Sequence, residues 1–179
     1  RRIYTPRAAK WFSSRSSRGP IVKTVAVIPA RYGSTRLPAK ALACETGKYL
    51  IQHVYERVIE CGKLDRVIVA TDDDRIVQAV RSFGGDVRMT RADHVSGTDR
   101  VAEVAAALGM ADDDLVLNIQ GDEPELHPSV LDRLIDRFDA VELRRANGDC
   151  RIGTIAARFS DDGPTEGAGS PLDPNRVKV

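Results

Sequence analysis

The chain has 179 residues, 42% of them hydrophobic and 30% charged, which suits one globular domain with a buried core. It contains no run of about 18 apolar residues, so no membrane-spanning helix is predicted. The net charge is +1, but residues 21–179 carry 21 basic and 26 acidic side chains, which argues against a nucleic-acid binder with a basic face.

Residues 1–20 are rich in Arg and Ser, with six basic residues and no acidic one. Such a composition is found in organelle transit peptides, but it also fits a disordered basic extension, which is the interpretation we favour. Residues 21–179 then form the folded domain. The first residue is Arg rather than Met, so we expect a fragment or a processed chain.

Short apolar runs alternate with amphipathic segments of helical period from residue 24 onward. Strands are predicted at 25–28, 66–70, 87–90, 115–119 and 152–158. The helical stripes are Ile51, Val54, Val58 and Ile59; Ile76, Val77, Val80 and Phe83; Val101, Val104, Ala105 and Leu108; and Val130, Leu131, Leu134, Ile135 and Phe138. This alternation predicts an α/β fold, a three-layer, mostly parallel sheet with helices on both faces.

Ligands of such sheets bind beyond the carboxyl ends of the strands. Polar loops follow four of the predicted strands there, at residues 29–40, 71–74, 91–100 and 120–124. In the second loop we expect Thr71 or Asp72 to cap the following helix. Beyond residue 139 the pattern weakens, residues 160–175 read as a surface loop, and 176–179 look like the start of an unfinished strand, so we expect a truncated C-terminus.

Three scattered cysteines (Cys44, Cys61 and Cys150) are odd in number and lack the spacing of metal ligands. Neither a disulfide framework nor a zinc site is predicted, and a reducing cytoplasm is the expected location.

The loop after the first strand combines three fixed positive charges, Arg31, Arg36 and Lys40, with a glycine and two prolines. Cationic side chains and inward-facing amides suit a polyphosphate, and the prolines reduce the freedom lost on binding. The sequence lacks both the P-loop pattern and the Gly-x-Gly-x-x-Gly turn. Taken alone, the loop could equally be a solvated basic turn.

The stretch "IPARYGSTRLPAKAL" resembles the signature of the cytidylyltransferases that activate acidic sugars. "VIVATDDDRI", "GGDVRMTRADHVSGTDRVAEV" and "LVLNIQGDEPEL" narrow the resemblance to the 3-deoxy-manno-octulosonate (Kdo) cytidylyltransferases, or CMP-Kdo synthetases. It extends from about residue 24 to 138, and faintly to 179. The resemblance implies a nucleotide-diphospho-sugar transferase fold, which is Rossmann-like.

In that family CTP lies over the first loop, and a sugar acid attacks its α-phosphate with loss of pyrophosphate. By resemblance, Arg31 and Lys40 neutralise the phosphates, Ser34 and the amides around Gly33 cradle them, and Ala30 also contacts the nucleotide. Fixed cations and backbone dipoles would lower the barrier that the negative triphosphate presents.

The sequence departs from the familiar loop at Ala39, where a glycine commonly precedes the lysine, and at Ala41, where proline is usual. We expect a small shift of loop geometry and no loss of charge.

After the fourth predicted strand, the resemblance assigns Asp122 to Mg²⁺ and Gln120 to substrate contact. A carboxylate on a rigid strand end, together with phosphate oxygens, is the arrangement Mg²⁺ prefers. A helix-capping or turn aspartate is the alternative, and Glu123 is a weaker candidate ligand.

For the cytosine pocket the resemblance implies Arg91, Ser96 and Gly97, with donors and acceptors matched to a pyrimidine edge. His94 lacks a paired nucleophile and is expected to be structural.

These expectations point to an enzyme that makes CMP-Kdo from CTP and Kdo for bacterial lipopolysaccharide, with Mg²⁺ as cofactor and a homodimer as the complete protein. The family's second metal carboxylate and sugar-binding half would lie past residue 179, so weak CTP binding and little turnover are expected of this chain. The alternatives are a cytidylyltransferase for sialic acid, a catalytically dead nucleotide-binding fragment, or a receiver-like module, although receivers lack the cationic loop.

Overall fold

The computed structural model describes residues 23–33, 37–111, 114–139 and 153–154. By its internal contacts the chain divides into two compact units, Arg1–Arg133 and Leu134–Val179. The predicted extension at residues 1–20, the loop at 160–175 and the strand start at 176–179 lie outside the described residues.

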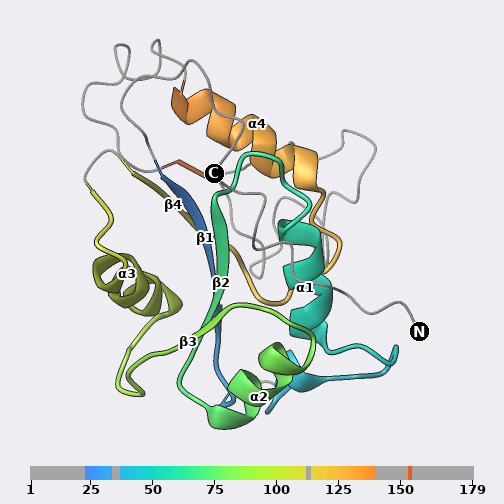
Figure 1. Cartoon of the computed structure of the whole chain (residues 1–179). Coiled ribbons are helices and arrows are strands. Elements are labelled where there is room, and N and C mark those ends of the chain that lie inside the picture. Colours follow the sequence, from blue (N-terminus) through green and yellow to red (C-terminus); the bar gives the residue numbers. More distant parts are fainter. Residues whose placement is uncertain (1–22, 34–36, 112–113, 140–152, 155–179) are drawn as a thin grey trace, which may run out of the picture. The chain divides into compact units, whose positions relative to one another are not determined.

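The first unit is built on a parallel sheet of β1 (Thr24–Ala30), β2 (Arg66–Thr71), β3 (Val87–Met89) and β4 (Leu115–Asn118), in the order β3-β2-β1-β4 (Figure 1). The register pairs Val27 with Ile68 on one side and with Asn118 on the other. Ala30 lies opposite Thr71, so the carboxyl ends of β1 and β2 are level. The predicted parallel α/β fold is confirmed for this unit.

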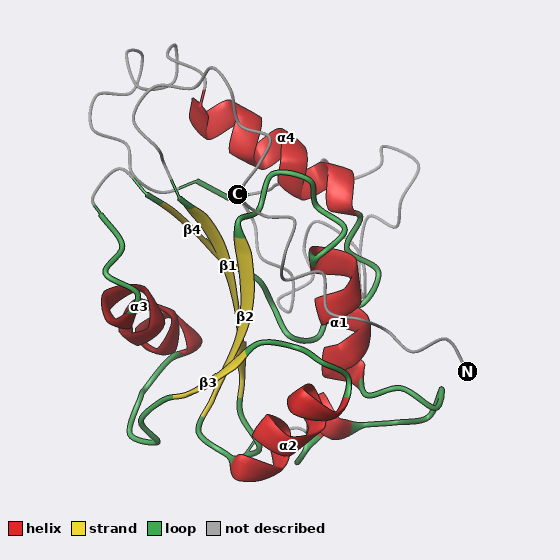
Figure 2. Cartoon of the chain, in the orientation of Figure 1, coloured by secondary structure: helices red, strands yellow, loops and turns green. Residues whose placement is uncertain are grey.

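Helices cover both faces of this sheet (Figure 2). Helix α3 (Gly97–Ala107) lies on one face, and α1 (Leu50–Val58) and α2 (Asp74–Ser82) lie on the other, with a short 3₁₀ helix η1 (Lys40–Leu42) ahead of α1. The first unit therefore has the three layers that the alternating pattern predicts.

The core explains why the strands are apolar on both sides. One cluster, facing α3, consists of Val25, Val27, Ile68, Ala70, Val101 and Val104. Toward the other face, Ile51, Val54 and Ile76 are fully buried, as the helical stripes predict. A parallel sheet with helices on both faces buries both sides of its central strands, so β1 and most of β2 are continuously hydrophobic rather than alternating.

The cap of α2 differs from the prediction. Asp73, rather than Thr71 or Asp72, is the N-cap residue, and its carboxylate accepts a hydrogen bond from the Arg75 amide at 2.9 Å. The Arg75 guanidinium also binds Asp73 and holds the pKa of that carboxyl below its ordinary value. Thr71 ends β2, and Asp72 pairs with another residue, so the helix begins one or two residues later than expected.

Helix α4 (Pro128–Asp139) begins in the first unit and ends in the second. Leu131 and Ile135 are buried, in agreement with the fourth predicted stripe. In the second unit Gly153 lies against Phe138, because a Cβ at this glycine would meet the phenyl ring at 2.7 Å. The strand predicted at 152–158 lies outside the described residues except for 153 and 154, which are not in a strand. Within the described ranges, no helix combines the length and apolar character that a bilayer crossing needs.

Candidate active site

The loop after β1 emerges at the centre of the sheet, with Arg31 and Gly33 exposed at its start. It closes on itself where the Ala39 amide donates a hydrogen bond to the carbonyl of Tyr32 at 2.9 Å. The Arg75 guanidinium lies over the Tyr32 ring, 3.3 Å from its centroid, and so ties this loop to α2. Ser34 and Arg36 lie outside the described residues.

Ala39 adopts a left-handed conformation, with φ of 57° and ψ of 22°, directly before Lys40 begins η1. Within the described ranges it is the one non-glycine residue with positive φ. An L-amino acid with a Cβ pays about 1–2 kcal/mol for this conformation, whereas glycine adopts it freely. The loop therefore keeps the backbone that a glycine would favour at this position.

Lys40 and Asp122 form the central contact of the site. The Lys40 Nζ lies 2.6 Å from the Asp122 Oδ2, although the two residues are 82 positions apart in the sequence. Their side chains are 40% and 49% exposed. An ion pair this exposed adds only about 0–1 kcal/mol of stability, so both charges can be redirected to a ligand at little cost.

Two glycines bring the neighbouring loops against the end of β1. A Cβ at Gly121 would lie 3.2 Å from the carbonyl oxygen of Pro29, and a Cβ at Gly97 would lie 3.3 Å from the Pro29 ring. The backbone before Asp122 and the start of α3 therefore both pack on Pro29. Gly121 was not recognised from the sequence; the signal that could have revealed it is its position directly before the candidate metal ligand.

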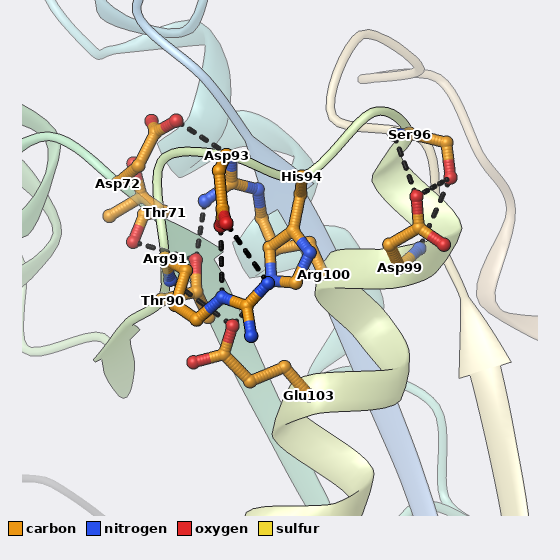
Figure 3. A network of polar contacts seen from close by, with 10 residues as sticks. All are labelled: Thr71, Asp72, Thr90, Arg91, Asp93, His94, Ser96, Asp99, Arg100 and Glu103. Carbon is orange, nitrogen blue, oxygen red and sulfur yellow. Dashed lines mark hydrogen bonds and ion pairs between the residues drawn. The ribbon is translucent and has the colours of Figure 1, made fainter.

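Ser96 caps α3. Its hydroxyl accepts a hydrogen bond from the Asp99 amide at 3.2 Å, and the Asp99 carboxylate accepts from the Ser96 amide at 2.9 Å (Figure 3). The Ser96 hydroxyl also donates to the Asp99 carboxylate at 2.8 Å, and this hydrogen bond, together with the one from the Ser96 amide, lowers the pKa of Asp99. The Ser-x-x-Asp spacing resembles the capping box pattern and could have been recognised from the sequence.

The rest of residues 91–96 is tied to the same helix. The Arg91 amide donates to the Glu103 Oε2 at 3.1 Å, and the His94 ring contacts the same carboxylate oxygen (Figure 3). The hydrogen bond from His94 lowers the pKa of Glu103. This contact ties His94 to α3, and its structural role stays a prediction. The Arg91 guanidinium is 69% exposed and pairs with Asp93.

Arg100, on the first turns of α3, reaches under this loop to Asp72 and Thr90. It is 4% exposed and was not recognised as a site residue from the sequence. Arginine side chains are usually exposed, so a sequence pattern predicts an exposed Arg100 on this helix. Its partners Asp72 and Thr90 are 28 and 10 positions away, so no local pattern reveals that it is buried.

The family model described as Cytidylyltransferase matches residues 25–178. The chain belongs to the cytidylyltransferase family.

The chain is 47% identical to the 3-deoxy-manno-octulosonate cytidylyltransferase of Geobacter metallireducens over 158 residues, an alignment that covers 88% of the chain and 56% of that protein. It is 46% identical over 153 residues to the 8-amino-3,8-dideoxy-manno-octulosonate cytidylyltransferase of Shewanella amazonensis, covering 86% of the chain and 58% of that protein. The chain thus spans little more than half the length of these curated relatives.

Among solved structures, the chain is similar to CMP:2-keto-3-deoxy-manno-octonic acid synthetase complexed with CTP. The TM-score is 0.63 at 48% identity, over 67% of this chain and 48% of that one. The Rossmann-like nucleotidyltransferase fold expected from the resemblance is therefore confirmed.

In this chain the residues predicted for phosphate and metal are brought together in part. Lys40 and Asp122 touch, whereas Arg31, Gln120 and Glu123 are exposed on the same loops. In the part of the chain that the structure describes, no three His, Cys, Asp or Glu side chains gather closely enough to hold a metal by themselves. A cation at Asp122 would need further oxygen ligands from its substrate and water.

A hollow of about 450 Å³ lies elsewhere on the cytidylyltransferase fold. It is lined by Leu42, Tyr49, Arg75, Gln78, Ala79 and Ser82, and it includes none of the predicted site residues. Because its lining carries one cation, already paired with Asp73, we place the chemistry at the strand ends instead.

Proposed function

We propose that the protein is a nucleotidyltransferase that activates Kdo with CTP, giving CMP-Kdo and pyrophosphate. The observation that carries the proposal is the Lys40–Asp122 contact at the end of β1, a cation beside a carboxylate in exposed loops. Magnesium triphosphate needs this combination, a positive group for the phosphates and an oxygen ligand for the metal. The similarity to a synthetase complexed with CTP supports the choice of nucleotide.

Substrate binding would exchange partners within this pair. Lys40 would turn from Asp122 to a phosphate oxygen, and the carboxylate would then be free for a cation. Arg31 is exposed directly after β1 and would add a second positive charge. Ser34 and the amides around Gly33 are proposed to cradle the phosphates, beside Ala30.

Mg²⁺ fits the residues that are present. Asp122 offers one exposed carboxylate, and Mg²⁺ commonly takes one or two carboxylates together with phosphate oxygens and water. Bound there, the ion would neutralise charge that develops on the phosphates. Glu123 is the neighbouring candidate for a second ligand, and Gln120 is proposed to contact the substrate.

The base would lie toward the loop at residues 91–96. Arg91 has an exposed guanidinium, and Ser96 and Gly97 start α3 against Pro29. We propose that these three residues recognise cytosine. Ser96 already caps the helix, so its contact with the base would use the capacity that remains on its hydroxyl or its carbonyl.

In the reaction, a hydroxyl oxygen of the sugar acid forms a bond to the α-phosphorus and gives up its proton to water, and the bond from that phosphorus to the bridging oxygen breaks. Pyrophosphate leaves with the electron pair. Lys40 and Arg31 would stabilise the negative charge on the phosphates as the bond breaks. The acceptor is proposed from the names of the curated relatives.

The curated relatives are named for two sugars, Kdo and its 8-amino-3,8-dideoxy analogue. We propose Kdo as the acceptor, with the 8-amino sugar as the second candidate, ahead of sialic acid. Lipopolysaccharide synthesis in the cytoplasm by a homodimer would follow from that activity. A nucleotide-binding fragment without turnover is the alternative for this chain taken alone.

Calorimetry with CTP, UTP and ATP, each with and without Mg²⁺, tests the nucleotide. CTP should bind most tightly, and Mg²⁺ should strengthen its binding. The Asp122→Asn variant should lose the Mg²⁺ effect but keep CTP binding in metal-free buffer, because Lys40 is then released.

Pyrophosphate release with each of the three sugars tests the acceptor. Failure of the chain to take up CTP would contradict the proposal.

A further inference from the structure

Arg100 is the one charged side chain that is fully buried in the described ranges. Burying a guanidinium is unfavourable unless each part of it is paired. Helix α3 already packs on the sheet through Val101 and Val104, so a buried cation beside them is not needed to hold the helix in place. The placement of Arg100 therefore calls for a role other than packing.

The partners of Arg100 lie at the ends of two strands. One nitrogen donates to the Asp72 Oδ2 at 2.7 Å, and another donates to the Thr90 hydroxyl (Figure 3). The Thr90 hydroxyl in turn donates to the carbonyl of Thr71 at 3.0 Å. A single side chain of α3 thus links the segment after β2 with the residue that immediately precedes Arg91.

Residues 91–96 are then held by α3 at their start, middle and end. Arg100 fixes Thr90, Glu103 binds the Arg91 amide and the His94 ring, and Asp99 binds Ser96. The backbone of the loop is fixed while the Arg91 side chain remains exposed. Such an arrangement holds exposed groups at a set distance and angle, which recognition of a base edge requires.

We propose that Arg100 is a positioning residue that sets the preference of the site for cytosine over uracil. It would act through Thr90 and Asp72, by holding Arg91 and Ser96 in the geometry that matches a cytosine edge. This inference rests on the proposed function, because it takes residues 91–97 as the base site.

The test compares the Kd for CTP and for UTP by calorimetry, in the 179-residue chain and its variants. Arg100→Lys keeps the charge but replaces a two-pronged donor by a point charge that cannot hold both partners. Thr90→Val removes only the hydroxyl at nearly constant volume. The matched control is Arg66→Lys, because Arg66 pairs with Asp86 at 2.6 Å at the opposite end of β2.

Both site variants should reduce the preference for CTP over UTP by about tenfold, since the loss of one hydrogen bond to the base changes binding by up to about that factor. The control should keep the wild-type ratio. A purely stabilising role would lower the melting temperature of the variants without changing the ratio, and that result would overturn the inference. If Arg100→Lys fails to fold, the ratio in Thr90→Val decides in the same way. Equal binding of both nucleotides by the wild-type chain would instead count against the proposed function.

Discussion

The loops after β1 and β3 stand at the same edge of the sheet but are built differently. The loop after β1 presents charge, with Arg31 exposed and Lys40 half exposed in a contact that a ligand can break. The loop after β3 is held by hydrogen bonds to Asp99, Arg100 and Glu103 of α3.

This difference agrees with the two kinds of recognition that we propose. A polyphosphate is bound through charge, which acts over distance and tolerates small movements, so the cations can remain in exposed positions. A base edge is distinguished by hydrogen bonds, which weaken steeply as distance and angle change. The fixed loop therefore suits the base, and the charged loop suits the phosphates.

The largest effect is expected from Lys40→Met. A charge-assisted hydrogen bond contributes about 1.5–3 kcal/mol, so calorimetry should show CTP binding about 10- to 150-fold weaker. The matched control is Lys48→Met, because Lys48 forms an exposed ion pair of the same length, 2.6 Å, with Glu56. Unchanged CTP binding in Lys40→Met would remove the basis for assigning phosphate to the loop after β1.

The second-largest effect is expected from Gly121→Ala. This glycine positions Asp122, which pairs with Lys40 of the loop after β1. The new Cβ would lie 3.2 Å from the Pro29 carbonyl oxygen, and backbone at the centre of a sheet cannot easily move away. Urea unfolding should show a loss of about 1–3 kcal/mol. Gly62→Ala is the control, since a Cβ there would meet nothing within 4 Å. Equal stability of the two variants would show that the approach to Pro29 is not tight.

Ala39→Gly should raise stability slightly. Relief of the left-handed conformation is offset in part by the entropy of glycine, which leaves a net gain of about 0.5–1 kcal/mol in urea unfolding. Ala43→Gly is the control, because Ala43 has a φ of −55° and has no such strain to lose, so it should be destabilised. A loss of stability in both variants would mean that the loop does not hold Ala39 in this conformation.

The smallest effect should appear at the end of the loop after β3. Because the folded protein lowers the pKa of Asp99 below its ordinary value of 3.8, the ionised carboxylate stabilises the fold above that pH. The contribution is lost as the pH falls below 3.8 and through the lowered pKa. Asp99→Asn should therefore be less stable than wild type at neutral pH, and urea unfolding should show the difference shrinking in acid. A difference that does not vary with pH would argue against the charge of Asp99 as its cause.

The sequence predicted the parts of the fold that local patterns encode. Apolar runs marked β1, β2, β3 and β4 to within one or two residues, and the stripes of three helices placed their buried faces correctly. It also predicted that Lys40 and Asp122 lie close together, which their contact confirms. The predicted N-cap of α2 was wrong, because three successive aspartates offer equivalent caps and the sequence does not show where β2 ends. Arg100 was missed because the burial of an arginine depends on partners that only folding supplies.

By itself the sequence determined the order of strands and helices, the parallel sheet and the charges placed after β1, since periodicity and residue type act along the chain. The tertiary structure alone decided that Lys40 meets Asp122 across 82 positions, that Gly97 and Gly121 pack on Pro29, and that Arg100 joins Asp72 to Thr90. These contacts depend on which strands become neighbours in the sheet, and the order β3-β2-β1-β4 brings distant loops to one edge.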